Sequence, residues 1–298
     1  MGYLFLRQKR VKKMLKKNDI INKIKEAVIS ASSSYRSDKL QAYRKALDEE
    51  NDQLSSWVIE KIIENEQIAR TKRCPTCDDT GIPHILLELG DECQLNFSVI
   101  QYIYQGIVEG LRLLPGRPMG LLGNDIERIV QSAGISPEPD DVVPAPFFIK
   151  KAPGQSLRVH ILLQGGGPEI RSKTYRIFHK NNLDLFVEEI ISWATDEVRL
   201  LGCTPVIIAL GVGRTHYEAT TQMLQAMVYG DLSKQNDIET KITTAVNETK
   251  VGPLGIKGNT TALGTYLSIG PQRASGVRIV CMRLCCIVEP RLATVVIE

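Results

Sequence analysis

The stretch that decides the fold is LRVHILLQGGGP, residues 157–168. Its first eight residues are mostly apolar and predict a buried strand. The three glycines that follow carry no Cβ, so another group can approach their backbone closely. We therefore expect a ligand-facing turn at Gly165, Gly166 and Gly167. The turn lacks the G-x-x-x-x-G-K-[ST] spacing of a phosphate loop, which excludes that class of nucleotide site.

Strands and helices alternate through the rest of the second half. Apolar runs predict strands at 84–89, 205–211, 261–269 and 276–287, and helical periodicity predicts helices at 97–114, 183–201, 216–229 and 232–246. This alternation predicts an α/β fold with a mixed sheet and flanking helices. The proline-rich segment 116–146 predicts a loop with one short helix.

The N-terminal part of the chain is expected to be helical. Residues 19–70 contain no glycine or proline, and Ser37 or Asp38 is expected to begin one long helix that ends near Ile68. This helical N-terminal extension joins the α/β core without a linker. We therefore predict one catalytic domain over residues 19–298.

Composition and charge exclude several classes of protein. The chain has 298 residues, 43% hydrophobic and 24% charged, which is typical of a globular protein. Residues 1–18 hold seven Lys/Arg and no acid. Because the net charge of the whole chain is +3, the other 280 residues have a net charge of −4. We interpret residues 1–18 as a basic tail and expect no nucleic-acid partner. No apolar run approaches the roughly 20 residues of a membrane span, and no secretory signal is present, so we expect a cytoplasmic location.

Seven cysteines without a secretory signal argue against a disulfide framework. Cys77, Cys203 and the pair Cys285-Cys286 each lie beside a turn or at a strand end, as ligands do when they converge from separate loops. Three thiolates of this kind suit an iron–sulfur cluster with one iron left open as a Lewis acid. Cys74 and Cys77 also form a C-x-x-C, for which a zinc or thiol redox role remains open.

Several blocks, taken in chain order, resemble the alpha subunit of the class I (iron–sulfur) fumarase and L(+)-tartrate dehydratase family. Residues 77–81, CDDTG, resemble the family's C-Q-D-T-G, with Asp78 in place of Gln. Leu111-Arg112 matches its L-R, and the segments 165–173, 202–215 and 252–264 resemble its glycine-rich and cysteine-containing blocks. The resemblance covers about residues 20–298.

The resemblance implies a hydro-lyase that adds or removes water on a small dicarboxylate such as fumarate, malate or tartrate. It implies a [4Fe–4S] cluster held by Cys77, Cys203 and Cys285, with Cys286 as the alternative third ligand. The register measured from Gly276 favours Cys285, whereas Cys286 brings Arg291 closer to the family's arginine.

Further site residues follow from the same resemblance. It implies substrate binding by Arg112, Asp78 and the backbone of Gly165, Gly166 and Gly167. It implies that Asp79 orients substrate or iron-bound water. In two-subunit members a beta subunit supplies the rest of the site, so a hetero-oligomer is expected.

Two other functions remain open from the sequence. In one, Cys74 closes the fourth iron position and the chain is an iron–sulfur redox or regulatory protein without hydratase activity. In the other, the cysteines are merely buried in a scaffold without a cluster. The identity of the dicarboxylate also stays open, because the candidates differ by one hydroxyl or methyl group.

Overall fold

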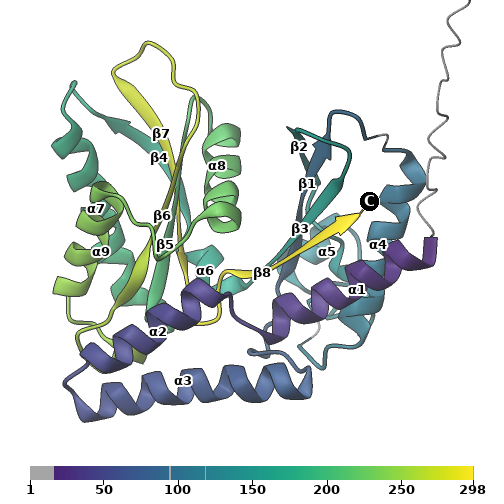
Figure 1. Cartoon of the computed structure of the whole chain (residues 1–298), viewed down its shortest axis with the longest axis horizontal. Coiled ribbons are helices and arrows are strands. Elements are labelled where there is room, and N and C mark those ends of the chain that lie inside the picture. The colour runs from purple at the N-terminus through teal and green to yellow at the C-terminus, as the bar shows by residue number, and fades with distance from the viewer. Residues whose placement is uncertain (1–16, 94, 118, 298) are drawn as a thin grey trace, which may run out of the picture.

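A computed structural model describes residues 17–93, 95–117 and 119–297 of the chain. Over this range the structure has two four-stranded mixed sheets with flanking helices (Figure 1). The predicted mixed α/β class and the helical N-terminal stretch are confirmed, although the strands form two sheets instead of one. The predicted basic tail lies outside the described residues, except that Lys17 and Asn18 begin the first helix.

The first sheet has the order β2-β1-β3-β8. Its strands are β1 (Ile82–Gly90), β2 (Phe148–Ala152), β3 (Leu157–Gln164) and β8 (Arg291–Ile297). Helices α1 (Lys17–Ser33) and α4 (Phe97–Arg112) pack on one face. Gly106 and Gly110 of α4 allow this packing, because a Cβ there would lie only 2.6–2.7 Å from the Cβ atoms of Ile24 and Val28.

The second sheet has the order β4-β7-β5-β6. Its strands are β4 (Lys173–Phe178), β5 (Val206–Gly213), β6 (Ala262–Ile269) and β7 (Val277–Cys285). Helices α7 (Leu183–Leu201) and α9 (Asp237–Glu248) pack on one face. Helix α8 (His216–Tyr229) covers the other face and shares its apolar core with Leu86 and Leu162 of the first sheet, so it lies between the two sheets (Figure 1).

Helix α2 (Ser37–Glu49) lies beneath the second sheet, and α3 (Gln53–Lys72) runs below α2 and extends toward the first sheet (Figure 1). The prediction of one long helix from Ser37 to Ile68 is therefore wrong. The break occurs because Glu50 accepts hydrogen bonds from the backbone N–H groups of Asn51, Asp52 and Asn259, and Asp52 then caps α3 through the Ser55 N–H. The same contacts join the break to the glycine-rich loop that precedes β6.

The remaining sequence-based predictions agree closely with the elements of the structure. The 116–146 segment contains one short α-helix, α5 (Asp125–Val130), and a 3₁₀ turn, Pro139–Val142. The glycine turn after β3 opens another short helix, α6 (Gly166–Ile170). Strands β2, β4 and β8 were not predicted, because each lies at a sheet edge and is only partly buried. None of the helices in the described ranges is both long and apolar enough to cross a membrane.

Candidate functional site

The Cys77 turn is held between α1 and α3. Helix α3 ends at Arg73, whose left-handed backbone turns the chain, and the Cys74 N–H donates to the Ala69 carbonyl. Thr76 then donates to the Ser32 carbonyl through both its backbone N–H and its hydroxyl, each at 3.0 Å. These contacts fix the start of the turn, so the Cys77 thiol is placed by two helices.

The Cys203 turn is held by the glycine-rich loop before β6. Cys203 follows Gly202, the left-handed cap of α7, and its thiol is exposed. The next residue, Thr204, accepts from Leu254 and Gly255 and donates to the Gly252 carbonyl. The glycine-rich loop therefore holds the turn of a candidate ligand in place.

The two candidates for the third cysteine, Cys285 and Cys286, lie in different surroundings. Cys285 is fully buried at the end of β7, opposite Ile207 of β5, and packs in the core that surrounds α8. Cys286 is only partly buried and packs against the same apolar cluster as Cys77, which contains Tyr35 and Tyr43. The Ile287 N–H donates to the Cys203 carbonyl at 3.1 Å, so the Cys286 segment also adjoins the Cys203 turn. The geometry thus brings the Cys77, Cys203 and Cys286 segments together.

Neither Cys77 nor Cys286 is activated as a free nucleophile. Burial raises the pKa of Cys77, and burial together with Glu289 raises the pKa of Cys286 to about 12. Reactive cysteines need a lowered pKa, which neither thiol has. No group of three His, Cys, Asp or Glu side chains in the described ranges could hold a single metal ion. A multi-iron cluster does not require such a group, because each thiolate binds a different iron.

Buried positive charge surrounds the cysteines. Arg283, Lys39 and Arg291 are each at most 1% exposed, whereas Glu289 is the buried carboxylate that pairs with Arg283, at 3.0 Å. Arg291 donates to the Leu163 and Asp79 carbonyls, and Lys39 donates to the Glu289 carbonyl. Buried cations need nearby anions, so this donor set fits an anionic group such as a thiolate-bound cluster.

Asp79 connects the Cys77 turn to the glycine turn. Its carboxylate accepts from the Gly81 N–H and the Gly166 N–H, each at 2.9 Å. Gly81 has a φ of +77°, and a Cβ there would collide with Arg291. Because Asp79 is committed to two backbone donors, its position is fixed by the fold.

The glycine turn is also held by Glu289, which accepts from the Gly165 N–H at 2.6 Å. Arg283 donates to the Gly165 carbonyl at 3.0 Å and pairs with the Glu169 carboxylate. A Cβ on Gly167 would meet nothing within 4 Å, and one on Gly166 only the Asp79 carboxylate at 3.9 Å. The turn therefore has open space beside Gly166 and Gly167. The N–H groups of Gly165 and Gly166 already donate hydrogen bonds to the carboxylates of Glu289 and Asp79.

Arg112 lies in a pocket of about 200 Å³ that adjoins the Cys77 turn. Its guanidinium is half exposed and lies 3.9 Å from the Glu138 carboxylate. Thr80 and a second arginine, Arg117, also line this pocket. Arg117 lies 3.7 Å from Asp78, and its backbone N–H donates to the Asp78 carbonyl. Asp78 therefore lies beside Arg117 at the rim of the pocket.

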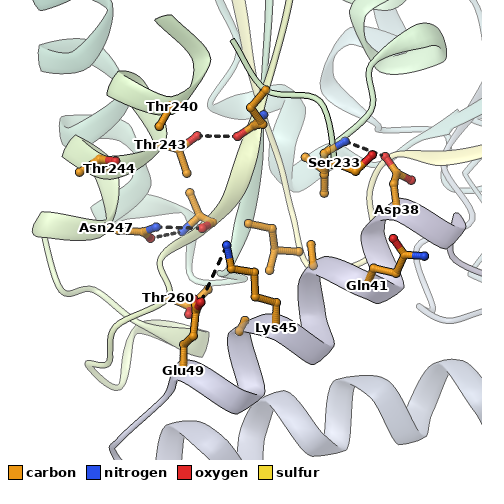
Figure 2. Close-up of a pocket in the computed structure, with 16 residues that line it drawn as sticks. Asp38, Gln41, Lys45, Glu49, Ser233, Thr240, Thr243, Thr244, Asn247 and Thr260 are labelled. Carbon is orange, nitrogen blue, oxygen red and sulfur yellow. Dashed lines mark hydrogen bonds and ion pairs between the residues drawn. The ribbon is translucent and has the colours of Figure 1, made fainter. Parts of the chain in front are cut away.

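A larger pocket, of about 680 Å³, lies between α2 and α9 (Figure 2). None of the described cysteines lines it. Several of its polar groups are paired with one another or with the backbone. Asn247 bonds the backbone of Thr261 and Ala262, Thr243 donates to Gln235, and Lys45 lies 3.8 Å from Glu49.

The buried charges were not identified from the sequence. Arg283 interrupts the apolar run 279–285 of β7, and this interruption was the available signal, because an arginine there must find a buried partner. Lys39, Tyr35 and Glu289 carry no local signal. Their roles depend on contacts between distant parts of the chain.

A comparison with known families decides the class of the protein. A model of the family described as fumarate hydratase (fumerase) matches residues 21–296. The chain belongs to the fumarate hydratase family. Fumarate hydratases and tartrate dehydratases are hydro-lyases, so the predicted enzyme class and the resemblance are confirmed at the level of this family.

Three relatives illustrate the breadth of this family. A Methanocaldococcus jannaschii protein, provisionally named as an L(+)-tartrate dehydratase alpha subunit, is 24% identical over 84% of this chain and 87% of its own length. The Escherichia coli (strain UTI89 / UPEC) L(+)-tartrate dehydratase alpha subunit is 18% identical over 88% of each chain. Fumarate hydratase 2 of Leishmania major is 25% identical over 64% of this chain, which corresponds to 33% of that longer protein.

Proposed function

We propose that the chain is the alpha subunit of a [4Fe–4S]-dependent hydro-lyase that acts on a small dicarboxylate and is completed by a beta subunit. One observation carries the proposal: the segments of Cys77, Cys203 and Cys286 meet where buried cations outnumber the buried carboxylate that pairs with them. The alpha-subunit names of the two tartrate dehydratase relatives support the expectation of a partner.

Cys77, Cys203 and Cys286 are our proposed ligands. We prefer Cys286 to Cys285 because Cys285 lies within the core around α8, whereas Cys286 shares an apolar cluster with Cys77. When bound, the cluster supplies an open iron that acts as a Lewis acid on the substrate hydroxyl.

The chain's own residues bind and orient the substrate. A dicarboxylate has two anionic ends, and the pocket beside the Cys77 turn offers two guanidinium groups, Arg112 and Arg117, whose planar forks match carboxylates. Asp79 holds the glycine turn in place, so that the open space beside Gly166 and Gly167 borders the substrate. Asp78 lies beside Arg117 and orients that arginine.

Anaerobic co-expression with a beta-type partner, followed by iron analysis and a panel of dicarboxylates, tests the proposal. We expect iron and sulfide in the complex, together with hydration or dehydration of at least one dicarboxylate. Activity should disappear in air and return with ferrous iron and a thiol. A complex that retains a full cluster, resists air and acts on none of the dicarboxylates would instead favour the redox or regulatory function, with Cys74 as the fourth ligand.

A further inference from the structure

Lys39 is a buried ammonium group beside the cysteines that the proposed reaction does not use. It extends from α2 and is 1% exposed. Its Nζ donates to the Glu289 carbonyl at 2.7 Å and lies 4.1 Å from the centre of the Tyr35 ring. Neither contact supplies a full negative charge, and a buried charge without a counter-charge is costly.

The nearby carboxylates are already engaged by other cations. Glu289 accepts two hydrogen bonds from Arg283 and one from the Gly165 N–H. Glu66 accepts from Arg70 and from the Tyr35 N–H. Burial lowers the pKa of Lys39 to about 7, and the sulfurs of Cys286 and Cys285, followed by Glu289, oppose this lowering. The Glu289 N–H donates to the Cys286 carbonyl at 2.9 Å, so the contact between the Lys39 Nζ and the Glu289 carbonyl places Lys39 beside the Cys286 turn.

Tyr35 presents a second buried donor to the same place. Its side chain is 5% exposed, and its hydroxyl has no hydrogen-bond partner among the described residues. Tyr35 packs in the same cluster as Cys286 and Cys77. A buried hydroxyl without an acceptor costs about 1–3 kcal/mol, which favours an acceptor bound within this cluster.

We propose that Lys39 is the buried counter-cation of the cluster held by Cys77, Cys203 and Cys286, with the Tyr35 hydroxyl as a hydrogen-bond donor beside it. The inference rests on the proposed function, since it requires the cluster. Positive charge and hydrogen bonds around the sulfurs stabilise the reduced cluster and slow its loss of iron. Lys39 is thus a positioning and charge-balancing residue, distinct from the groups that bind substrate.

Lys39→Met tests this role because it keeps the side chain's length and removes its charge. In the anaerobically reconstituted full chain, it should lower the equilibrium constant for one-electron reduction about tenfold, a shift of about 59 mV toward lower potential. The shift is measured by a redox titration followed by electron paramagnetic resonance. Iron release to a chelator should become about tenfold faster. The iron-free variant should unfold at the same or a higher temperature than the iron-free wild type, since an unpaired buried charge is gone.

Lys45→Met is the matched control, because Lys45 lies on the same helix with its side chain 74% exposed. It should match the wild type in potential, iron release and unfolding. Tyr35→Phe should shift the potential in the same direction as Lys39→Met, by less. Should Lys39→Met fail to fold, Lys39→Gln removes the charge while keeping a donor.

Two outcomes would overturn the role of Lys39. One is a folded Lys39 variant with the potential and iron-release rate of the wild type. The other is an iron-free variant that is less stable while its cluster potential is unchanged, which would make Lys39 a purely structural residue. A wild-type chain that takes up no iron overturns the proposed function together with this inference, so the two failures are distinguishable.

Discussion

The cysteine region and the large pocket between α2 and α9 satisfy their polar groups in different ways. In the pocket, the side chains of Thr243, Asn247 and Lys45 each have a polar partner nearby (Figure 2). Around the cysteines, Lys39 and Arg291 donate only to backbone carbonyls among the described residues, and the Tyr35 hydroxyl has no acceptor there. Unbalanced buried charge is therefore a better indicator of a ligand site here than cavity volume.

Removing a proposed cluster ligand should have the largest effect. It also tests whether Cys286 or Cys285 is the third ligand. Cys286→Ala should abolish iron retention, because the cluster then lacks one of its three thiolates. Cys285→Ala, one residue away, should keep its iron, because Cys285 packs inside the core around α8. Iron analysis of anaerobically reconstituted protein measures both. The reverse pattern would move the third ligand back to Cys285.

Breaking the buried ion pair should give the next largest effect. Glu289→Gln leaves the guanidinium of Arg283 without its buried carboxylate and should lower the free energy of unfolding by about 3–5 kcal/mol. Denaturant unfolding of the iron-free chain measures the loss. Glu218→Gln, which breaks the exposed pair with Arg214, should leave the midpoint almost unchanged. Equal losses of unfolding free energy in the two variants would show that breaking the buried pair costs no more than breaking the exposed one.

Arg112→Lys tests whether the smaller pocket binds substrate. A lysine cannot reproduce the two-pronged contact with a carboxylate, so transition-state binding should weaken by about 2 kcal/mol, which is roughly 30-fold in kcat/KM. Steady-state kinetics of the complex measure this, with iron content as the control. Unchanged kinetics would mean that the substrate does not contact Arg112.

A second buried cluster, distant from the cysteines, shows what buried charge does without a cofactor. His160 lies 3.6 Å from Glu88, and burial lowers the pKa of His160 although Glu88 opposes this effect. Because the folded pKa lies below the ordinary value of about 6.5, the unfolded chain binds the proton more tightly. The stability that His160 contributes is therefore present above pH 6.5 and is lost as the pH falls through that value toward the folded pKa.

Thermal unfolding of the iron-free chain from pH 8 to pH 5.5 measures this effect. His160→Gln should show a smaller drop in unfolding temperature than the wild type. Some drop should remain, because burial also lowers the pKa of His84. Identical pH profiles for the variant and the wild type would contradict the assignment to His160.

The smallest effect is expected in the large pocket. Thr244→Leu adds bulk to its exposed lining and should leave iron content and kcat/KM unchanged. The same two assays used for the variants above measure this. A loss of activity with the cluster intact would make the large pocket part of the active site and would remove the contrast between the two regions.

Most elements of the fold could be predicted from local sequence patterns. The helices at 183–201 and 216–229 and the strand at 157–164 have the predicted bounds, because apolar periodicity and capping residues lie within each segment. The prediction of one long helix was wrong because Glu50 accepts hydrogen bonds from Asn259 and Thr260, more than 200 positions away. The edge strands were not predicted because each has one exposed side and a weak apolar pattern.

Some residues of the candidate site could likewise be predicted from the sequence, whereas others could not. Cys77, Cys203 and the Cys285-Cys286 pair were identified by their turns, and Arg112 by the family block that contains it. The choice between Cys285 and Cys286 could not be made, since both follow the same apolar strand. Arg117 was missed because its role depends on its position beside Asp78 and Thr80.

The sequence by itself determined the family, most of the helices and central strands, and the loops from which the cysteines come. These properties depend on residues close together in the chain. Tertiary structure alone decided that Cys286 lies with Cys77, that Glu289 pairs with Arg283 and holds the glycine turn, and that Lys39 is buried beside the cysteines. Lys39 and Glu289 are 250 positions apart, and the need of a buried charge for a partner acts through space, so no local pattern encodes which partner it finds.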